Sequence, residues 1–155
     1  MDLAHQYLTL NERFASFLDG AVDAAFWATH VHNDDDDLPQ PAQEFPVTDT
    51  ELTILRGTIA HHTRDWFIAH LADITRAADA LGHFSHIGHD FWLTSQGHGA
   101  GFWDRGLDEI GDTLTDSVSG HSDIVGLYLN DEATHVHIDP YNVQDFSTTL
   151  FRDNN

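Results

Sequence analysis

The side chains best suited to chemistry lie close together between residues 86 and 105. They are His86, His89, Asp90, His98, Asp104 and Arg105. Imidazole and carboxylate groups bind divalent metal ions and also work as general acids and bases. The five glycines in residues 88–106 would let a substrate approach the backbone closely. The same glycines suit the turns and bulges of a tight hairpin, so a structural role for this segment stays open.

A second candidate group is the segment HVHID, residues 135–139. His135, His137 and Asp139 alternate along the chain, so in a strand all three side chains project from one face. Two histidines spaced in this way recur in metal sites, although a polar strand face explains the same pattern. The two segments together define one hypothesis, a metal-binding protein or an enzyme that uses a divalent metal. Its ligands would come from His89, Asp90, His98, Asp104, His135 and His137.

The formal charge of the chain is −20, from 26 acidic residues against six basic ones, all of them Arg. Such a surface repels nucleic acid and anionic membranes and attracts basic proteins, including those that normally bind nucleic acid. Adaptation to high salt explains an Asp-rich surface without Lys, because salt screens self-repulsion. Imitation of a polyanion is the second explanation, and the two are compatible.

Two acidic segments are the candidate contacts for a basic partner. Asp108, Asp112 and Asp116 recur every four residues, so on a helix they form a row that rises about 6 Å per step. That spacing is close to the distance between phosphates along a nucleic-acid strand. The second segment is an acidic, proline-containing loop with four consecutive carboxylates, Asp34, Asp35, Asp36 and Asp37.

Length and composition predict a single intracellular domain over residues 1–155. The hydrophobic fraction of 41% is enough for a core, and no apolar run approaches the roughly 20 residues that span a bilayer. The first ten residues lack the basic and apolar regions of a signal peptide. The chain has no cysteine, which excludes disulfides, thiol catalysis and cysteine-ligated zinc.

The positions that carry these candidate residues depend on the predicted elements. Apolar spacing predicts a helix over residues 11–29 with Asn11 as its N-cap, and one or two helices over 49–81 that begin at Thr48 and stop at Gly82. Any break in the second segment is expected at Gly57 or at the pair His61–His62. These helices make up a helical half, residues 1–82.

A hairpin–helix–hairpin half is predicted for residues 86–139. The aromatic runs DFWLT and GFWDR read as strands joined by a glycine-rich turn, and VGLYL and THVHI as a second hairpin, with a helix over 107–118 between them. The predicted fold is therefore α+β, with N-terminal helices packed on a four-stranded antiparallel sheet of ββ-α-ββ order. The tail, residues 140–155, is expected to pack locally through Tyr141, Phe146 and Phe151.

The block GHDFWLTSQGHGAGFWDRGLDEIGDTLT, residues 88–115, resembles the central motif of a family of small uncharacterised proteins of tailed phages and prophages. AAFWAT, residues 24–29, and GLYLNDE, residues 126–132, extend the resemblance to roughly residues 14–138. The chain departs from the family at Ser95–Gln96, where a basic residue is frequent, and in its lack of Lys. The resemblance implies a viral origin, in a haloarchaeal virus given the Asp bias, and supplies no catalytic residues.

The sequence therefore favours a viral accessory protein that acts by binding in the host cytoplasm, without a cofactor. Its expected partner is a basic host protein that handles nucleic acid, such as a restriction or CRISPR-type defence protein, and the expected contacts are the two acidic segments. Direct binding of nucleic acid or membrane is not expected. The alternative is the divalent-metal protein described above.

Overall fold

The computed structural model describes residues 8–33, 36–119, 121 and 124–141, and it is an α+β structure. The elements in chain order are α1 (Leu10–Ala28), β1 (His30–Asn33), β2 (Asp36–Pro41), the 3-10 helix η1 (Ala42–Glu44), α2 (Asp49–Ala69), α3 (Leu71–Leu81), α4 (Phe84–Ser95), the 3-10 helix η2 (Phe102–Asp104), α5 (Glu109–Ser117), β3 (Val125–Leu129) and β4 (Val136–Pro140). None of the helices in the described part of the chain has the length and apolar character needed to cross a membrane.

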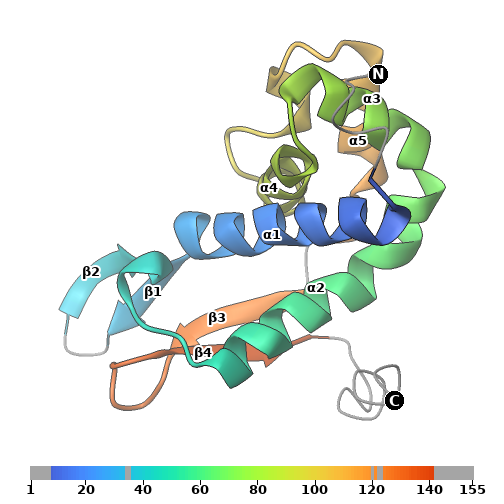
Figure 1. Ribbon diagram of the computed structural model, residues 1–155. Helices are drawn as coiled ribbons and strands as arrows, with labels where there is room; N and C mark the ends of the chain where they lie inside the picture. Colours follow the sequence, from blue (N-terminus) through green and yellow to red (C-terminus); the bar gives the residue numbers. More distant parts are fainter. Residues whose placement is uncertain (1–7, 34–35, 120, 122–123, 142–155) are drawn as a thin grey trace.

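Helix α1 lies at the centre of the molecule (Figure 1). Helices α3, α4 and α5 lie on one side of it, and α2 with the β3–β4 hairpin lies on the other. The β1–β2 hairpin follows the C-terminal end of α1. A cluster of aromatic rings fills the core, in which Phe17 contacts Phe14, Trp66, Phe67 and Phe91 with ring centroids 5.2–5.8 Å apart.

The predicted helices near the N-terminus are confirmed, with corrections at their ends. Helix α1 is capped by Thr9 and not by Asn11, because the Thr9 hydroxyl accepts from the Glu12 amide at 3.1 Å and the Glu12 carboxylate accepts from the Thr9 amide at 3.2 Å. Thr48 caps α2 as predicted. The break between α2 and α3 falls at His70, and not at Gly57 or His61–His62.

The predicted four-stranded sheet is wrong. The described strands form two separate two-stranded antiparallel sheets, β1 with β2 and β3 with β4. The second predicted hairpin exists, with Val125 opposite Pro140 and Leu129 opposite Val136. The first does not, because residues 84–95 form α4 and residues 102–104 form η2.

Helix α4 forms because its apolar residues recur at helical spacing. Phe84, Ile87, Gly88, Phe91 and Trp92 are all buried. In a strand, the neighbours Phe91 and Trp92 would point to opposite faces, and one of them would leave the core. The helix buries both side chains, with the Phe91 ring against Phe17 of α1, and so buries more apolar surface than the predicted strand would.

The predicted acidic loop and tail lie partly outside the described residues. The loop is interrupted by β1 and β2, which pair with a shift in register between Val31 and Asn33. Asp36 and Asp37 belong to β2, whereas Asp34 and Asp35 lie outside the described part of the chain. Of the predicted tail contacts, Tyr141 is described, and its amide donates to the Ile124 carbonyl at 2.9 Å; Phe146 and Phe151 are outside.

Candidate functional site

Two glycines bring α1 and α4 into direct backbone contact. A Cβ atom at Gly20 would lie 1.8 Å from the Ser85 carbonyl oxygen, and one at Gly88 would lie 1.8 Å from the Phe17 carbonyl oxygen. Since real Cβ atoms do not approach so closely, only glycine permits this crossing. The crossing fixes the positions of the side chains that project beside it from both helices.

A hollow of about 530 Å³, open to solvent, lies beside the α1–α4 crossing. This size falls within the usual range of ligand pockets. Its lining comes from α1, the end of α3, α4 and the segment after η2. The lining residues are Gly20, Asp23, Leu81, Ser85, His86, His89, Asp90 and Arg105.

An ion pair between Asp90 and Arg105 closes one wall of the hollow. Asp90 is 2% exposed, and its carboxylate accepts from Arg105 Nη2 at 2.8 Å and from Nε at 3.1 Å on both oxygens. These hydrogen bonds raise the pKa of the Arg105 guanidinium, which therefore stays charged. The pair ties α4 to the segment after η2, and it leaves no oxygen of Asp90 unpaired.

His89 stands next to this pair on the hollow side of α4. Burial of the ring lowers the pKa of His89 below its ordinary value, and the charge of Asp90 only partly opposes this. Burial therefore favours the neutral ring, which has one nitrogen that donates a hydrogen bond and one that accepts. Trp27 of α1 packs against the ring, with centroids 5.5 Å apart.

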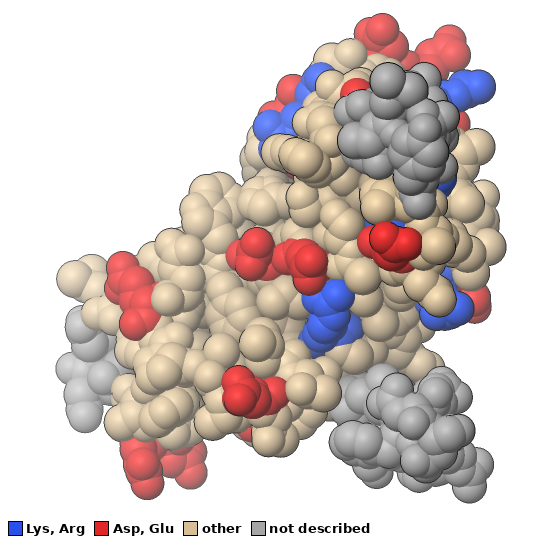
Figure 2. Space-filling view, in the orientation of Figure 1, with Lys and Arg blue, Asp and Glu red and all other residues tan. Residues whose placement is uncertain are grey.

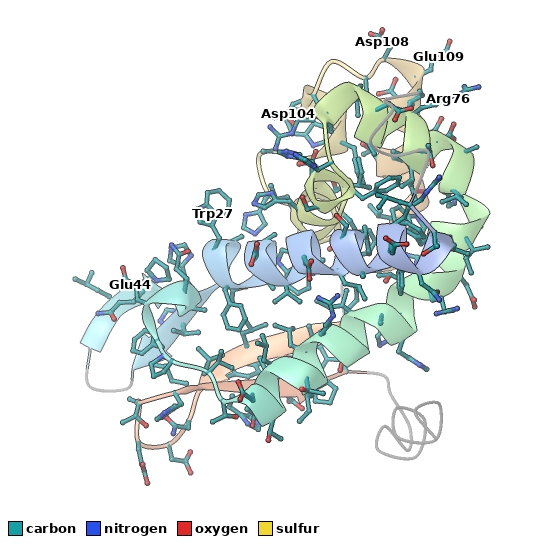
Figure 3. All side chains as sticks on the ribbon, in the orientation of Figure 1. Trp27, Glu44, Arg76, Asp104, Asp108 and Glu109 are labelled. Carbon is teal, nitrogen blue, oxygen red and sulfur yellow. The ribbon has the colours of Figure 1, made fainter. Side chains whose placement is uncertain are left out.

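Trp27 is not itself a lining residue, but its exposed indole contacts the ring of His89, which lines the hollow. Its side chain is 52% exposed, whereas Trp66 and Trp92 are buried in the core. Figure 3 shows Trp27 projecting from α1 on the side of α4 and away from the β3–β4 hairpin. Asp23 precedes it by one helical turn, so both side chains lie on the same face of α1.

Apart from the Asp90–Arg105 pair, the polar side chains of the hollow make no hydrogen bond with the described residues. Asp23, Ser85 and His89 make no side-chain hydrogen bond or ion pair with any described group, and the described ring contact of His86 is with His83, 5.8 Å away. Asp23 and His86 are exposed and Ser85 and His89 are half-buried, so these groups are within reach of water or of a ligand. Acceptors and donors that converge on a hollow without partners indicate a place for a ligand.

Much of the motif around the hollow has a structural explanation. The Thr94 hydroxyl accepts from the Phe102 amide at 3.2 Å, and the Asp104 carboxylate accepts from the Gly101 amide at 2.9 Å. A Cβ at Gly101 would lie 2.3 Å from Thr94 Oγ1. These contacts fold residues 96–106 onto the end of α4 and so hold Arg105 in place.

The residues of the metal hypothesis do not come together. Asp90 is bound by Arg105, Asp104 caps η2, and His98 is exposed in the loop after α4. His135 and His137 lie in the β3–β4 hairpin, where their Nδ1 atoms contact Thr134 at 2.9 Å and Glu51 at 3.2 Å. Within the described ranges, no three His, Asp or Glu side chains are placed to share a metal ion.

The acidic row is present on the exposed face of α5. Asp108 precedes the helix, and Asp112 and Asp116 follow at one-turn intervals; all three are exposed and none pairs with a described basic residue. Asp108 has φ 55° and ψ −127°, a conformation that is costly for a residue with a side chain. Its carboxylate accepts no capping hydrogen bond from its own helix. The row is therefore available to a partner.

Sequence reasoning missed Asp23, Trp27 and Ser85. Ser85 lies one turn before His89 on α4, whereas the relation of Asp23 and Trp27 to His89 depends on the crossing of α1 and α4, which are about 60 residues apart in the chain. The signal that could have found them is the glycine in each helix, because Gly20 and Gly88 are each flanked at helical spacing by core residues.

Neither a family model nor a curated protein nor a solved structure matches this chain.

Proposed function

We propose that this protein is a small acidic accessory protein of a virus, which acts by binding a basic host protein that handles nucleic acid. The observation that carries the proposal is the row of Asp108, Asp112 and Asp116 on α5. The three carboxylates are exposed, regularly spaced and without a described ionic partner. Like charges four residues apart repel by a few tenths of a kcal/mol in a helix, and the helix dipole favours Asp108 and Asp112 at the N-terminal end of α5 by a similar amount.

The charge of the whole molecule supports the same kind of partner. A charge of −20 draws basic proteins over long distances at low salt. Figure 2 shows that, on the face it displays, the acidic side chains lie in several groups separated by uncharged surface. General attraction thus comes from the whole surface, whereas the α5 row supplies the regular spacing that a nucleic-acid-binding groove would recognise.

The location in the host cytoplasm and the viral origin are parts of this proposal. They are supported by the motif of residues 88–115 and by an Asp-rich composition without Lys. A defence protein of the restriction or CRISPR type is a suitable partner, because such proteins carry basic grooves for nucleic acid.

The test is capture of the partner from a host lysate with the tagged full-length chain, at salt concentrations from roughly 0.1 to 3 M. The decisive variant is Asp108→Asn/Asp112→Asn/Asp116→Asn. The matched control is Glu44→Gln/Asp131→Asn/Glu132→Gln, three exposed acids away from α5 that change the charge by the same amount. Circular dichroism confirms the fold of each variant at each salt concentration.

The proposal predicts that the wild type and the control capture a nucleic-acid-binding protein, that the α5 variant loses it, and that added duplex DNA displaces it. Equal capture by both variants, or a captured protein that DNA does not displace, would contradict the proposal.

A further inference from the structure

The hollow beside the α1–α4 crossing presents mainly hydrogen-bond acceptors. The Asp23 carboxylate can only accept, and the Ser85 hydroxyl and the unprotonated nitrogen of His89 can also accept. All three groups can therefore accept from a ligand that carries several donors, while the Ser85 O–H and the His89 N–H can still donate to water in the open hollow. The arginine guanidinium is such a ligand, with five N–H donors in one plane.

The charge around the hollow favours a cation. Arg105 is already paired with Asp90 at 2.8 Å and lies 3.9 Å from Asp104. With Asp23, these groups are three carboxylates and one guanidinium, a net charge of −2. A second guanidinium would thus enter a negative environment, whereas an anionic ligand such as a nucleotide would be repelled by the site and by the whole surface.

Trp27 supplies a flat surface for a planar cation. The indole is half exposed, and it lies one helical turn from Asp23 and in contact with the His89 ring. A guanidinium stacks on an indole with a favourable cation–π interaction, and Arg takes part in such pairs more often than Lys. On the same helix face, the carboxylate would pair with the charge of the guanidinium and the indole would stack on its plane.

We propose that this hollow binds the guanidinium group of an arginine side chain, with Asp23 pairing with its charge, Ser85 and His89 accepting its N–H groups, and Trp27 stacking on its plane. The inference rests on the proposed function in one respect, since a basic partner protein supplies the arginine. It adds a specific pocket to the general attraction of the acidic surface.

The test uses the full-length chain and three short peptides that differ in one residue: acetyl-Gly-Gly-Arg-Gly-Gly-amide, its Lys analogue and its citrulline analogue. The Lys peptide keeps the charge without the plane, and the citrulline peptide keeps the plane without the charge. Dissociation constants are measured by calorimetry for the wild type and for the variants Asp23→Asn and Trp27→Leu. Asp116→Asn is the matched control, because it removes one exposed carboxylate away from the hollow.

The expected result is that the Arg peptide binds about fivefold or more tightly than either analogue. Asp23→Asn and Trp27→Leu should each weaken its binding about tenfold, and Asp116→Asn less than twofold. Since Asp23 and Trp27 are exposed, these variants are expected to keep the wild-type melting temperature, which is checked for each.

Three outcomes would overturn the inference. The Lys peptide could bind as tightly as the Arg peptide, with Asp23→Asn and Asp116→Asn weakening the binding equally. That result would mean that the general surface charge attracts the peptides, and it would leave the proposed function standing. Adenosine, added as a fourth probe, could bind in preference to the Arg peptide and assign the hollow to a nucleobase. Absence of binding by every probe would remove the site. The proposed function has its own test, and it fails if the α5 variant captures the host protein as well as the control variant does.

Discussion

The two faces of α4 differ in what their side chains contact. One face carries Gly88, Phe91 and Trp92, which are buried against α1 and the aromatic core. The other carries Ser85, His86 and His89, which border an open hollow and have no hydrogen-bond partner among the described residues. Packing explains the first face, whereas the second face packs on α1 only through the Ser85 backbone and the His89 ring, and folding does not explain its polar side-chain groups. A motif that looks uniform in sequence therefore divides into a structural part and a part available for binding.

The largest effect is expected from Gly88→Ala, on the packed face. The new Cβ would lie 1.8 Å from the Phe17 carbonyl oxygen, so α1 and α4 would have to separate. The better helix propensity of Ala offsets up to about 1 kcal/mol, and the remaining loss should be about 2 kcal/mol or more. Chemical denaturation measures it, with Gly99→Ala as the control, because nothing lies within 4 Å of a Cβ there.

The same experiment on the hollow face would sharpen the comparison. His86→Ala is expected to change stability by less than about 0.5 kcal/mol, as for an exposed site. A loss from His86→Ala as large as that from Gly88→Ala would show that both faces serve folding, and the division of α4 would be wrong.

An effect between those of Gly88→Ala and His86→Ala is expected from Arg105→Gln, at the border between the two faces. The change leaves the buried Asp90 carboxylate without its cation, and the expected cost is about 1–3 kcal/mol, lower than for a fully buried pair because Arg105 is 36% exposed. Arg76→Gln on α3, an exposed arginine, is the control. If thermal melting shows the same small shift for both variants, the pair does not hold the wall of the hollow.

The smallest effect is the pH dependence that His89 contributes. Its folded-state pKa is lowered by burial, so below pH of about 6.5 the unfolded chain binds a proton that the folded chain does not. The stability from His89 is therefore lost as pH falls from about 6.5 through the lower folded pKa, where Asp23, His86, Asp90 and Arg105 are its charged or titratable neighbours. NMR titration of the His89 ring measures this pKa.

His62 should show the same sign, because burial also lowers its pKa. His89→Gln is expected to remove only the part of the pH dependence that belongs to His89. A His89 titration midpoint above its ordinary value would contradict the account, since the ring would then be charged at the pH where it must accept a hydrogen bond.

The elements with local signals were predictable from the sequence. The hydroxyl of Thr48, the stop at Gly82 and the alternation of VGLYL and THVHI depend on residues close in the chain, and the structure has the corresponding cap, helix end and hairpin. α4 was mistaken for a strand, because DFWLT is aromatic and is followed by a glycine-rich turn. The helix is favoured over a strand by its burial against α1, which is a long-range contact that the local sequence does not show.

Only part of the candidate site could be predicted, because long-range contacts also bring its residues together. Asp90 and Arg105 were chosen for their chemistry and do meet, through a helix and a loop and not through a hairpin. His135 and His137, the predicted metal ligands in the β3–β4 hairpin, contact Thr134 and Glu51 through Nδ1. Asp23 and Trp27 carry no local signal of a site, since a helix face with one carboxylate and one indole is ordinary.

The most direct test of the central claim, that the unpartnered face of α4 is a binding face, is the indole region of the ¹H–¹⁵N NMR spectrum during titration with the Arg peptide. The chain has four tryptophans, and each gives one Nε1–H signal. The account predicts that the signal of Trp27, which contacts the His89 ring, moves with saturation, whereas those of the buried Trp66 and Trp92 stay in place. A Trp27 signal that stays fixed while amides along the exposed acidic residues move would contradict it.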